Sequence, residues 1–314
     1  MNTTPAALRM VALGDSLTEG LGDPTPDPVP DRCPGTEAGR SPWRGWAALL
    51  ATGLQPNREG VDLRNLAVSG AQTADVLHRQ LPLARAHRPH LAAVVVGVND
   101  TLRASYDIHA IARNLDTVLG SLAAEGTTLL TACLPDPGRM LGLPEPLARP
   151  LARRMRSVND VIHALSDRHA AVHVHIADCD WVDDPEMWSV DRLHPSERGH
   201  RALAREFHAL LRARGAASGS APGAEPLGPP PTRGAQTWWM LTKGTRWVLD
   251  RCTDLLPDLL RLALAESRQR RSGTAVLLDH RAAAETSAAL RALRIVEGRD
   301  DSRFDLQSDL QEVS

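Results

Sequence analysis

Residues 9–17, RMVALGDSL, join an apolar run to a turn and a serine. The run at 9–13 is typical of a short buried β-strand, and Gly14 permits a tight turn at its end. Ser16 is therefore expected just past the carboxyl end of this strand, and residues 18–20 can form the first turn of a helix. A serine in this position can serve as a nucleophile, but it can also be a simple helix N-cap.

Strands and helices alternate from residue 9 to residue 212. Four more strands are expected at 62–68, 91–96, 127–134 and 171–177, and four helices at 46–54, 107–124, 147–168 and 196–212. Strands joined by helical crossovers form parallel sheets with helices on both faces. The sequence therefore predicts an α/β fold of three layers, α/β/α, around a five-stranded parallel sheet. Sheets of this kind bind ligands at the carboxyl ends of their strands.

Two other segments also follow predicted strands. Gly70 ends the segment NLAVSG (65–70), and Asn99 lies in GVND (97–100). We expect both residues on the same rim of the sheet as Ser16, because the carboxyl ends of parallel strands meet at one edge. The backbone N–H of Gly70 and the side-chain amide of Asn99 are donors of the kind that stabilise an oxyanion. Each segment taken alone also fits an ordinary turn.

The segment DRLHP (191–195) supplies a candidate base, His194, with Asp191 three residues before it. An aspartate can bond one ring nitrogen of a histidine and leave the other nitrogen to take a proton from a serine. Without such a partner, a histidine ahead of a helix is more often a surface residue. The G-x-S-x-G elbow of α/β hydrolases is absent, because Thr18 occupies the second position after Ser16.

Together, the segments at 14–17, 65–70, 97–100 and 191–194 resemble the SGNH hydrolases, the family also called GDSL esterases and lipases. The resemblance covers residues 9–212 and implies a flavodoxin-like fold. It also implies a catalytic triad of Ser16, His194 and Asp191. The backbone N–H of Ser16, the backbone N–H of Gly70 and the side chain of Asn99 would form the oxyanion hole. No metal or other cofactor is expected.

The reaction that this resemblance implies is esterase- or lipase-like hydrolysis of carboxylic esters, taken as small-molecule substrates, through an acyl-Ser16 intermediate. An O-acyltransferase or a carbohydrate deacetylase could use the same site, and a non-catalytic scaffold acting through the C-terminal segment is a third alternative. The proline-rich loop at 24–42 leaves the size of the substrate open. Trp188 is a candidate substrate-binding residue, although a place in the core fits it equally well.

Composition limits the other classes of function. A net charge of -2 gives no electrostatic basis for binding nucleic acid. The four cysteines form no CxxC pair, so neither a disulfide framework nor a zinc site is expected.

His173 and His175 share a face of one strand and are expected to pack as neutral rings, while His200 is expected at the surface. The start of the chain leaves no room for a signal sequence, and no run reaches the ~20 apolar residues of a membrane span. We therefore expect a cytoplasmic protein.

The domain organisation changes after the alternating region. We expect the hydrolase domain at 1–214, a Pro/Gly/Ala-rich linker at 215–236, an amphipathic helical segment at 237–265 and a charged, flexible tail at 266–314. The amphipathic segment could pack on the domain, join two copies of the chain or lie peripherally on a membrane. The sequence leaves these three alternatives open.

Overall fold

The computed structural model describes residues 7–30, 40–54, 60–227, 257, 260–268 and 275–294. Its main sheet has five strands in the order β4-β1-β5-β6-β7, and every neighbouring pair is parallel. The strands are β1 (Leu8–Gly14), β4 (Val61–Asn65), β5 (Leu91–Val95), β6 (Thr128–Cys133) and β7 (Val172–His175). Each of the five strands begins within one residue of the position expected from the sequence. The predicted parallel sheet is confirmed.

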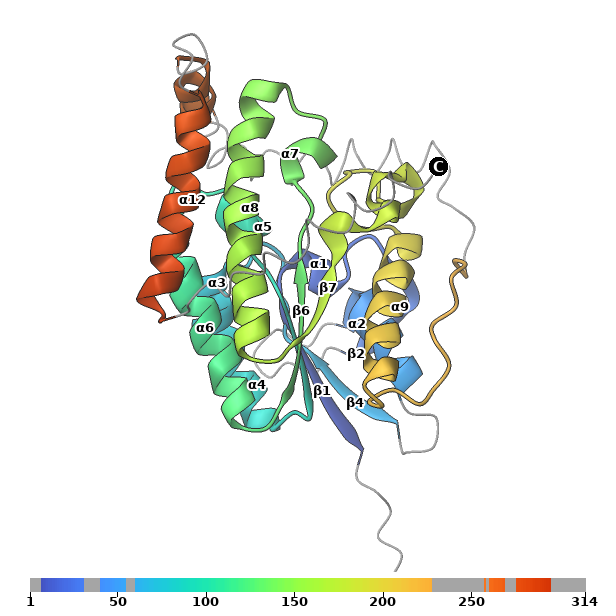
Figure 1. The fold of residues 1–314 in the computed structure, drawn as a ribbon. Helices are drawn as coiled ribbons and strands as arrows, with labels where there is room; N and C mark the ends of the chain where they lie inside the picture. Colours follow the sequence, from blue (N-terminus) through green and yellow to red (C-terminus); the bar gives the residue numbers. More distant parts are fainter. Residues whose placement is uncertain are drawn as a thin grey trace, which may run out of the picture.

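Helices cover both faces of the sheet and give the three expected layers (Figure 1). One face carries α2 (Gly45–Leu54) and α9 (Glu197–Ala213), and the other carries α4 (Leu81–His87), α6 (Ile108–Ala124) and α8 (Glu145–Arg168). Trp46 and Phe207, both fully buried, stack at 4.9 Å between ring centroids and join α2 to α9. Burial of two such large rings stabilises the packing of α2 against α9.

Short elements connect the larger ones. These are α1 (Ser16–Glu19), the antiparallel pair β2 (Pro24–Pro30) and β3 (Arg40–Trp43), α3 (Thr73–Asp75), the π-helical turn η1 (Val76–Gln80), α5 (Val98–Thr101), α7 (Pro137–Met140) and the 3₁₀ turns η2 (Ile176–Asp178), η3 (Asp180–Asp183) and η4 (Pro185–Met187). The continuous helical stretch from α3 to α4 was not expected from the sequence. Pro82 lies in its middle, where it begins α4 rather than ending the helix.

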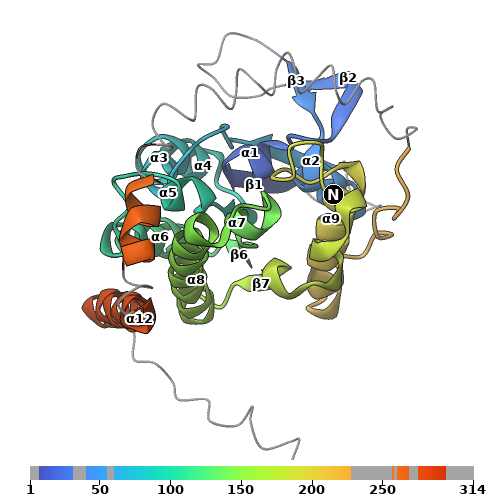
Figure 2. The same cartoon turned by 90° about the horizontal axis from the view of Figure 1, so that it is seen from above.

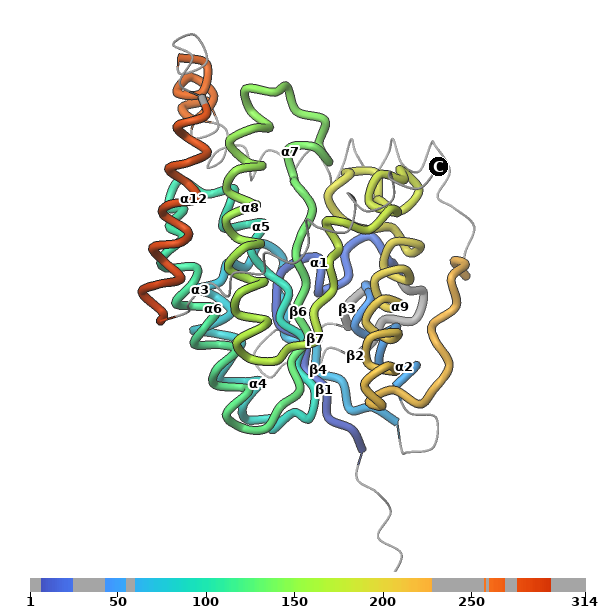
Figure 3. The backbone as a smooth tube through the Cα atoms, viewed as in Figure 1, coloured from blue at the N-terminus to red at the C-terminus, as the bar shows by residue number. Residues whose placement is uncertain are grey.

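Residues 215–227 return alongside α9, as the tube in Figure 3 shows. Backbone carbonyls of this segment accept hydrogen bonds from α9: Gly219 from His208 (3.1 Å), Pro222 from Arg205 (2.9 Å) and Gly223 from Arg201 (3.0 Å). Side chains of α9 therefore hold the first half of the expected linker in place. The composition of residues 215–236 did not predict these contacts. Most of the expected amphipathic segment at 237–265 lies outside the described residues.

The helix α12 (Ala275–Ala292) lies outside α6 and α8 and adds a further layer (Figure 2). Ala289 and Leu290, near the end of α12, are buried. Arg153 of α8 bonds both Asp279 (2.7 Å) and Glu266 (3.0 Å), and Glu266 is only 1% exposed. This part of the chain therefore differs from the flexible tail expected at 266–314, because its acidic residues find arginine partners on α8. In the described part of the chain, no helix has both the length and the apolar character to cross a bilayer.

Candidate active site

Ser16 lies at the amino end of α1, immediately after β1. The backbone of Gly14 is held by the buried side chain of Gln80, whose Oε1 accepts from the Gly14 N–H and whose Nε2 donates to the Gly14 carbonyl, both at 2.8 Å. Gly14 has φ +152°, and a Cβ there would lie 2.1 Å from the carbonyl oxygen of Val95. Only glycine fits so close to β5, which explains the residue type two positions before the serine.

The N-cap of α1 is Asp15 rather than Ser16. Asp15 Oδ1 accepts from the backbone N–H of Leu17 at 3.1 Å. The reading of Ser16 as a simple N-cap is therefore wrong, and its hydroxyl is free of the capping role.

Ser16, His194 and Asp191 form a continuous hydrogen-bonded chain. Ser16 Oγ lies 2.7 Å from His194 Nε2, and His194 Nδ1 lies 2.6 Å from Asp191 Oδ2. His194 is 5% exposed. The structure thus brings together three residues that the sequence separates by up to 178 positions, in the geometry of a nucleophile, a base and an orienting acid.

Asp191 is ionised and well anchored. Burial raises the pKa of its carboxyl, but the hydrogen bond and charge of His194, the His194 N–H and the Ser189 hydroxyl outweigh burial and hold the pKa at about 2. Asp191 Oδ1 accepts from Ser189 Oγ (2.7 Å) and from the N–H groups of Leu193 and His194 (both 3.0 Å). One oxygen therefore shapes the loop while the other orients the histidine.

The proposed oxyanion donors lie near this chain. Asn99, in α5, donates from Nδ2 to Asp15 Oδ2 at 3.1 Å and to the backbone carbonyl of Ala71 at 3.2 Å. Gly70, the residue before Ala71, is half-buried in the turn after β4 with φ +83°. Asn99 is thus tied both to the cap of α1 and to the Gly70 turn, so the three segments expected on one rim are linked directly.

Asp15 and Asp100 are buried carboxyls beside these donors. Burial raises the pKa of each to about 6, although hydrogen bonds from Leu17 to Asp15 and from Thr73 to Asp100 act in the opposite direction. Asp100 accepts from the N–H of Thr73 (3.1 Å) and from its hydroxyl (2.7 Å). Both aspartates therefore hold loops through hydrogen bonds from backbone amides.

His200 is fully buried, and its expected surface position is wrong. Its Nδ1 accepts from the Trp46 N–H at 3.2 Å, and its Nε2 donates to the Leu21 carbonyl at 2.9 Å. Burial lowers its pKa to about 4, so the ring is neutral. The residue lies on the face of α9 that packs against α2, which the periodicity of the helix alone did not identify. Its two bonds tie the loop that follows α1, at Leu21, to the first turn of α2, at Trp46.

An ion-pair network that the sequence did not indicate holds the same loop. Arg44 bonds Asp23 Oδ1 at 2.9 Å and Glu197 Oε1 at 2.7 Å, and Asp23 Oδ2 also accepts from the Gly45 N–H at 3.2 Å. Asp23 is fully buried. These residues connect the region after Ser16 to the first turn of α9, close to the His194 loop.

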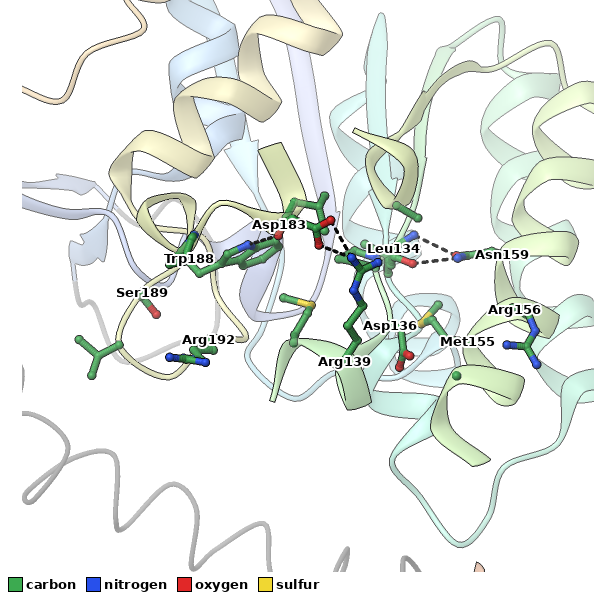
Figure 4. A pocket seen from close by; sticks show the side chains of 17 residues that line it. Leu134, Asp136, Arg139, Met155, Arg156, Asn159, Asp183, Trp188, Ser189 and Arg192 are labelled. Carbon is green, nitrogen blue, oxygen red and sulfur yellow. Dashed lines mark hydrogen bonds and ion pairs between the residues drawn. The ribbon is translucent and has the colours of Figure 1, made fainter. Parts of the chain in front are cut away.

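A polar cavity of about 590 Å³ adjoins the His194 loop (Figure 4). Ser189, Val190 and Arg192 of the loop line one side, and residues from 134–159 line the other. Trp188 lies at this cavity, where its indole Nε1 donates to the Val182 carbonyl at 2.8 Å. The tryptophan is therefore half-buried at a cavity wall rather than in the core.

In the described part of the chain, one group of side chains has the composition of a metal site: Cys133, His163, His173 and His175. None of the four belongs to the Ser16 site.

Comparisons with known proteins bear on the family and the fold of this chain. The model of the GDSL-like Lipase/Acylhydrolase family matches residues 12–202. A search of curated proteins gave no match. Similar solved structures include a variant of an acetyl-xylooligosaccharide esterase from Geobacillus stearothermophilus, with 19% identity, a TM-score of 0.51 and coverage of 67% of this chain and 96% of that one. At these identities the structures show the shared fold.

Two further structures have the same fold. One is an α/β hydrolase enzyme from the metagenome of Lake Arreo in Spain, with 21% identity, a TM-score of 0.52 and coverage of 67% of this chain and 98% of that one. The other is the lipase/acylhydrolase of Enterococcus faecalis, with 18% identity, a TM-score of 0.50 and coverage of 68% and 98%.

Proposed function

The chain belongs to the GDSL-like lipase and acylhydrolase family, a family of ester hydrolases, and we propose that it cleaves carboxylic esters through a covalent acyl-Ser16 intermediate. The observation that carries this proposal is the hydrogen-bonded chain from Ser16 Oγ through the His194 ring to Asp191. A serine hydroxyl becomes a competent nucleophile when a positioned base removes its proton.

The first half of the reaction forms the acyl-enzyme. His194 Nε2 takes the proton of Ser16 as Oγ attacks the ester carbonyl, and the Asp191 carboxylate stabilises the imidazolium that results. The tetrahedral intermediate then collapses, and His194 gives its proton to the departing alcohol oxygen. In the second half, His194 deprotonates a water that attacks the acyl carbon. The second tetrahedral intermediate collapses as His194 returns this proton to Ser16 Oγ, which releases the acid and free Ser16.

The negative charge of each tetrahedral intermediate needs donors. The N–H groups of Ser16 and Gly70 and the amide of Asn99 are the proposed set. Both N–H bonds of the Asn99 amide have acceptors in the free protein, namely Asp15 and the Ala71 carbonyl. An oxyanion is a stronger acceptor than a peptide carbonyl. We therefore propose that Asn99 keeps Asp15 as its orienting partner and exchanges Ala71 for the oxyanion.

Labelling with a fluorophosphonate probe tests the nucleophile. The wild type should form one adduct, mapped to Ser16 by peptide mass spectrometry, whereas Ser16→Ala and His194→Ala should remain unmodified. Ser105→Ala, which removes an exposed serine, is the matched control and should label as the wild type does. An adduct at another serine in the wild type would disprove the assignment.

The cavity beside the loop favours a second candidate, deacetylation of a carbohydrate. Its lining includes three arginines, two aspartates and an asparagine: Arg139, Arg156, Arg192, Asp136, Asp183 and Asn159. Such groups bind hydroxyl-rich molecules better than acyl chains. One structural neighbour is named an acetyl-xylooligosaccharide esterase.

A substrate comparison separates the two candidates. Initial rates on an acyl chain-length series of aryl esters would be measured beside acetate release from acetylated xylo-oligosaccharides. Higher kcat/KM for the acetylated sugar, reduced in Arg192→Ala, would support deacetylation. Faster turnover of longer acyl chains would support a lipase-like role, and transfer to added alcohols would identify an acyltransferase.

A further inference from the structure

Four side chains capable of binding a metal converge at the β7 edge of the sheet. Cys133 ends β6, His173 and His175 lie on β7, and His163 comes from α8. The register of the sheet places Cys133 directly opposite His175, on the same face as His173. One donor atom from each residue lies within 4.8 Å of all the others. We call this group the Cys–His cluster.

Three imidazole rings in mutual contact are unusual for simple packing. The ring centroids are 4.8 Å apart for His163 and His173, 4.7 Å for His173 and His175, and 5.0 Å for His163 and His175. The Nε2 atoms of His163 and His173 are buried and have no hydrogen-bond partner. A buried polar atom without a partner costs about 1–3 kcal/mol, so two in one cluster require an explanation. A bound cation would satisfy both atoms.

Hydrogen bonds indicate which nitrogen of His173 carries its proton. Ser166 Oγ donates to the Ile162 carbonyl at 2.6 Å, so the Thr131 hydroxyl, 2.7 Å away, can donate to Ser166. His173 Nδ1 lies 2.9 Å from Thr131 Oγ1. Because the Thr131 hydroxyl proton is directed to Ser166, His173 Nδ1 is the donor in this bond and Thr131 Oγ1 the acceptor. This assignment places the proton on Nδ1 and leaves a lone pair on Nε2. Metal-binding histidines are commonly held in this way by a bond at the other nitrogen.

An acidic side chain lies beside the cluster. The carboxylate of Asp178 lies 4.0 Å from His175 Nδ1 and would partly balance the charge of an ion.

We propose that Cys133, His163, His173 and His175 bind one Zn²⁺ ion. One thiolate and three imidazoles form a complete tetrahedral set for zinc, which is typical of a structural site. Tetrahedral zinc needs donor atoms ~3.3–3.6 Å apart, so the cluster must contract on binding. The side chain of His175 is 57% exposed and has room to rotate inward. Binding forms the Zn–S bond and releases the thiol proton of Cys133 to solvent.

The ion would tie three elements together at the base of the acid–base loop. The chain leaves His175 through η2, η3 and η4 and then reaches Asp191 and His194. Zinc would therefore stabilise the anchor of this loop without touching the reacting atoms. The sequence did not predict a zinc site, because its ligands come from three separate elements and lack the paired spacing of common zinc motifs.

Metal titration of the full chain tests the proposal. The chelator-treated protein should bind one equivalent of Zn²⁺, measured by competition with a chromophoric chelator, and its melting temperature should rise. Co²⁺ should give the visible bands of a tetrahedral site and a thiolate charge-transfer band. In Cys133→Ala the charge-transfer band should disappear, and in His173→Gln and His163→Gln the affinity should fall by at least about 10-fold.

Two substitutions outside the cluster are matched controls. Cys179→Ala removes the neighbouring half-buried thiol, and His78→Gln removes an exposed imidazole. Both variants should bind zinc as the wild type does. Circular dichroism would verify that each variant is folded, and His163→Gln, on a helix rather than a strand, serves if a β7 variant fails to fold. The proposal is overturned if the wild type binds no stoichiometric zinc, or if binding survives in folded Cys133→Ala and His163→Gln.

Discussion

The side-chain amide of Asn99 donates a hydrogen bond to the buried carboxyl of Asp15, with 3.1 Å between Nδ2 and Oδ2. The same carboxyl caps α1 through the N–H of Leu17. One aspartate therefore positions both the turn that carries the proposed nucleophile and an amide proposed to bind the oxyanion. Both bonds need an acceptor at this position, which the carboxyl of Asp15 supplies although burial raises its pKa to about 6.

Replacing Asn99 by alanine should lower kcat by about 10²–10³, because one donor to the tetrahedral oxygen is lost. KM should change by much less, since the interaction strengthens only as charge develops. Steady-state kinetics on an aryl acetate would measure both constants. Asn114→Ala is the matched control, because Asn114 bonds Thr73 at 3.3 Å from α6 and takes no part in the proposed reaction. An equal loss in both variants would argue against the oxyanion role.

Asp15→Asn should change how stability depends on pH. The folded-state pKa of about 6 lies above the ordinary 3.8, so the folded protein binds more protons between these values, and the wild type loses stability as pH rises through this window. The variant cannot ionise there. Relative to wild type, its free energy of unfolding should therefore increase from pH 4 to pH 7 by on the order of 2–3 kcal/mol. Urea denaturation at several pH values measures this difference.

The control for that series is Asp107→Asn, which removes the exposed N-cap carboxylate of α6. The pH-dependent gain in Asp15→Asn should exceed any gain in this control. A difference between Asp15→Asn and the wild type that stayed constant from pH 4 to pH 7 would show that burial does not disfavour the charged form of Asp15.

The sequence predicted the sheet and the acid–base pair because both depend on local patterns. An apolar run such as 91–96 predicts a buried strand whatever elements surround it, and β5 is indeed buried along its whole length. Asp191 and His194 are three residues apart, so a single loop turn brings them together. The order of the four segments then identified the family, which the match to residues 12–202 confirms.

What the sequence could not predict depends on contacts between distant elements. His200 is buried only because α9 packs on α2, and nothing in residues 196–212 names that partner. The helix α12 has little amphipathic character of its own, and its Asp279 pairs with both Arg149 and Arg153 of α8. The Cys–His cluster likewise exists only once β6, β7 and α8 are in place.

Asp191→Asn should lower kcat by about 10³–10⁴, because an amide facing His194 Nδ1 no longer holds the proton there or stabilises the imidazolium. Asp191 lies behind the histidine, so KM should remain within a few-fold of wild type. Asp184→Asn, in the same loop, alters a carboxylate that caps η4 and should retain near wild-type kcat. Retained activity in Asp191→Asn would mean that His194 is oriented by its loop alone.

Leu290→Ala should lower the free energy of unfolding by about 2–4 kcal/mol, because this leucine is 4% exposed in the packed region of α12 and its truncation leaves a cavity. Leu277→Ala lies on the same helix, but Leu277 is 61% exposed, so the change should be under about 0.5 kcal/mol. Urea denaturation of both variants measures the difference. Since α12 is separated from Ser16 by α6 and α8, kcat/KM should be unchanged in both. Equal stabilities would show that α12 does not pack on the catalytic domain in solution.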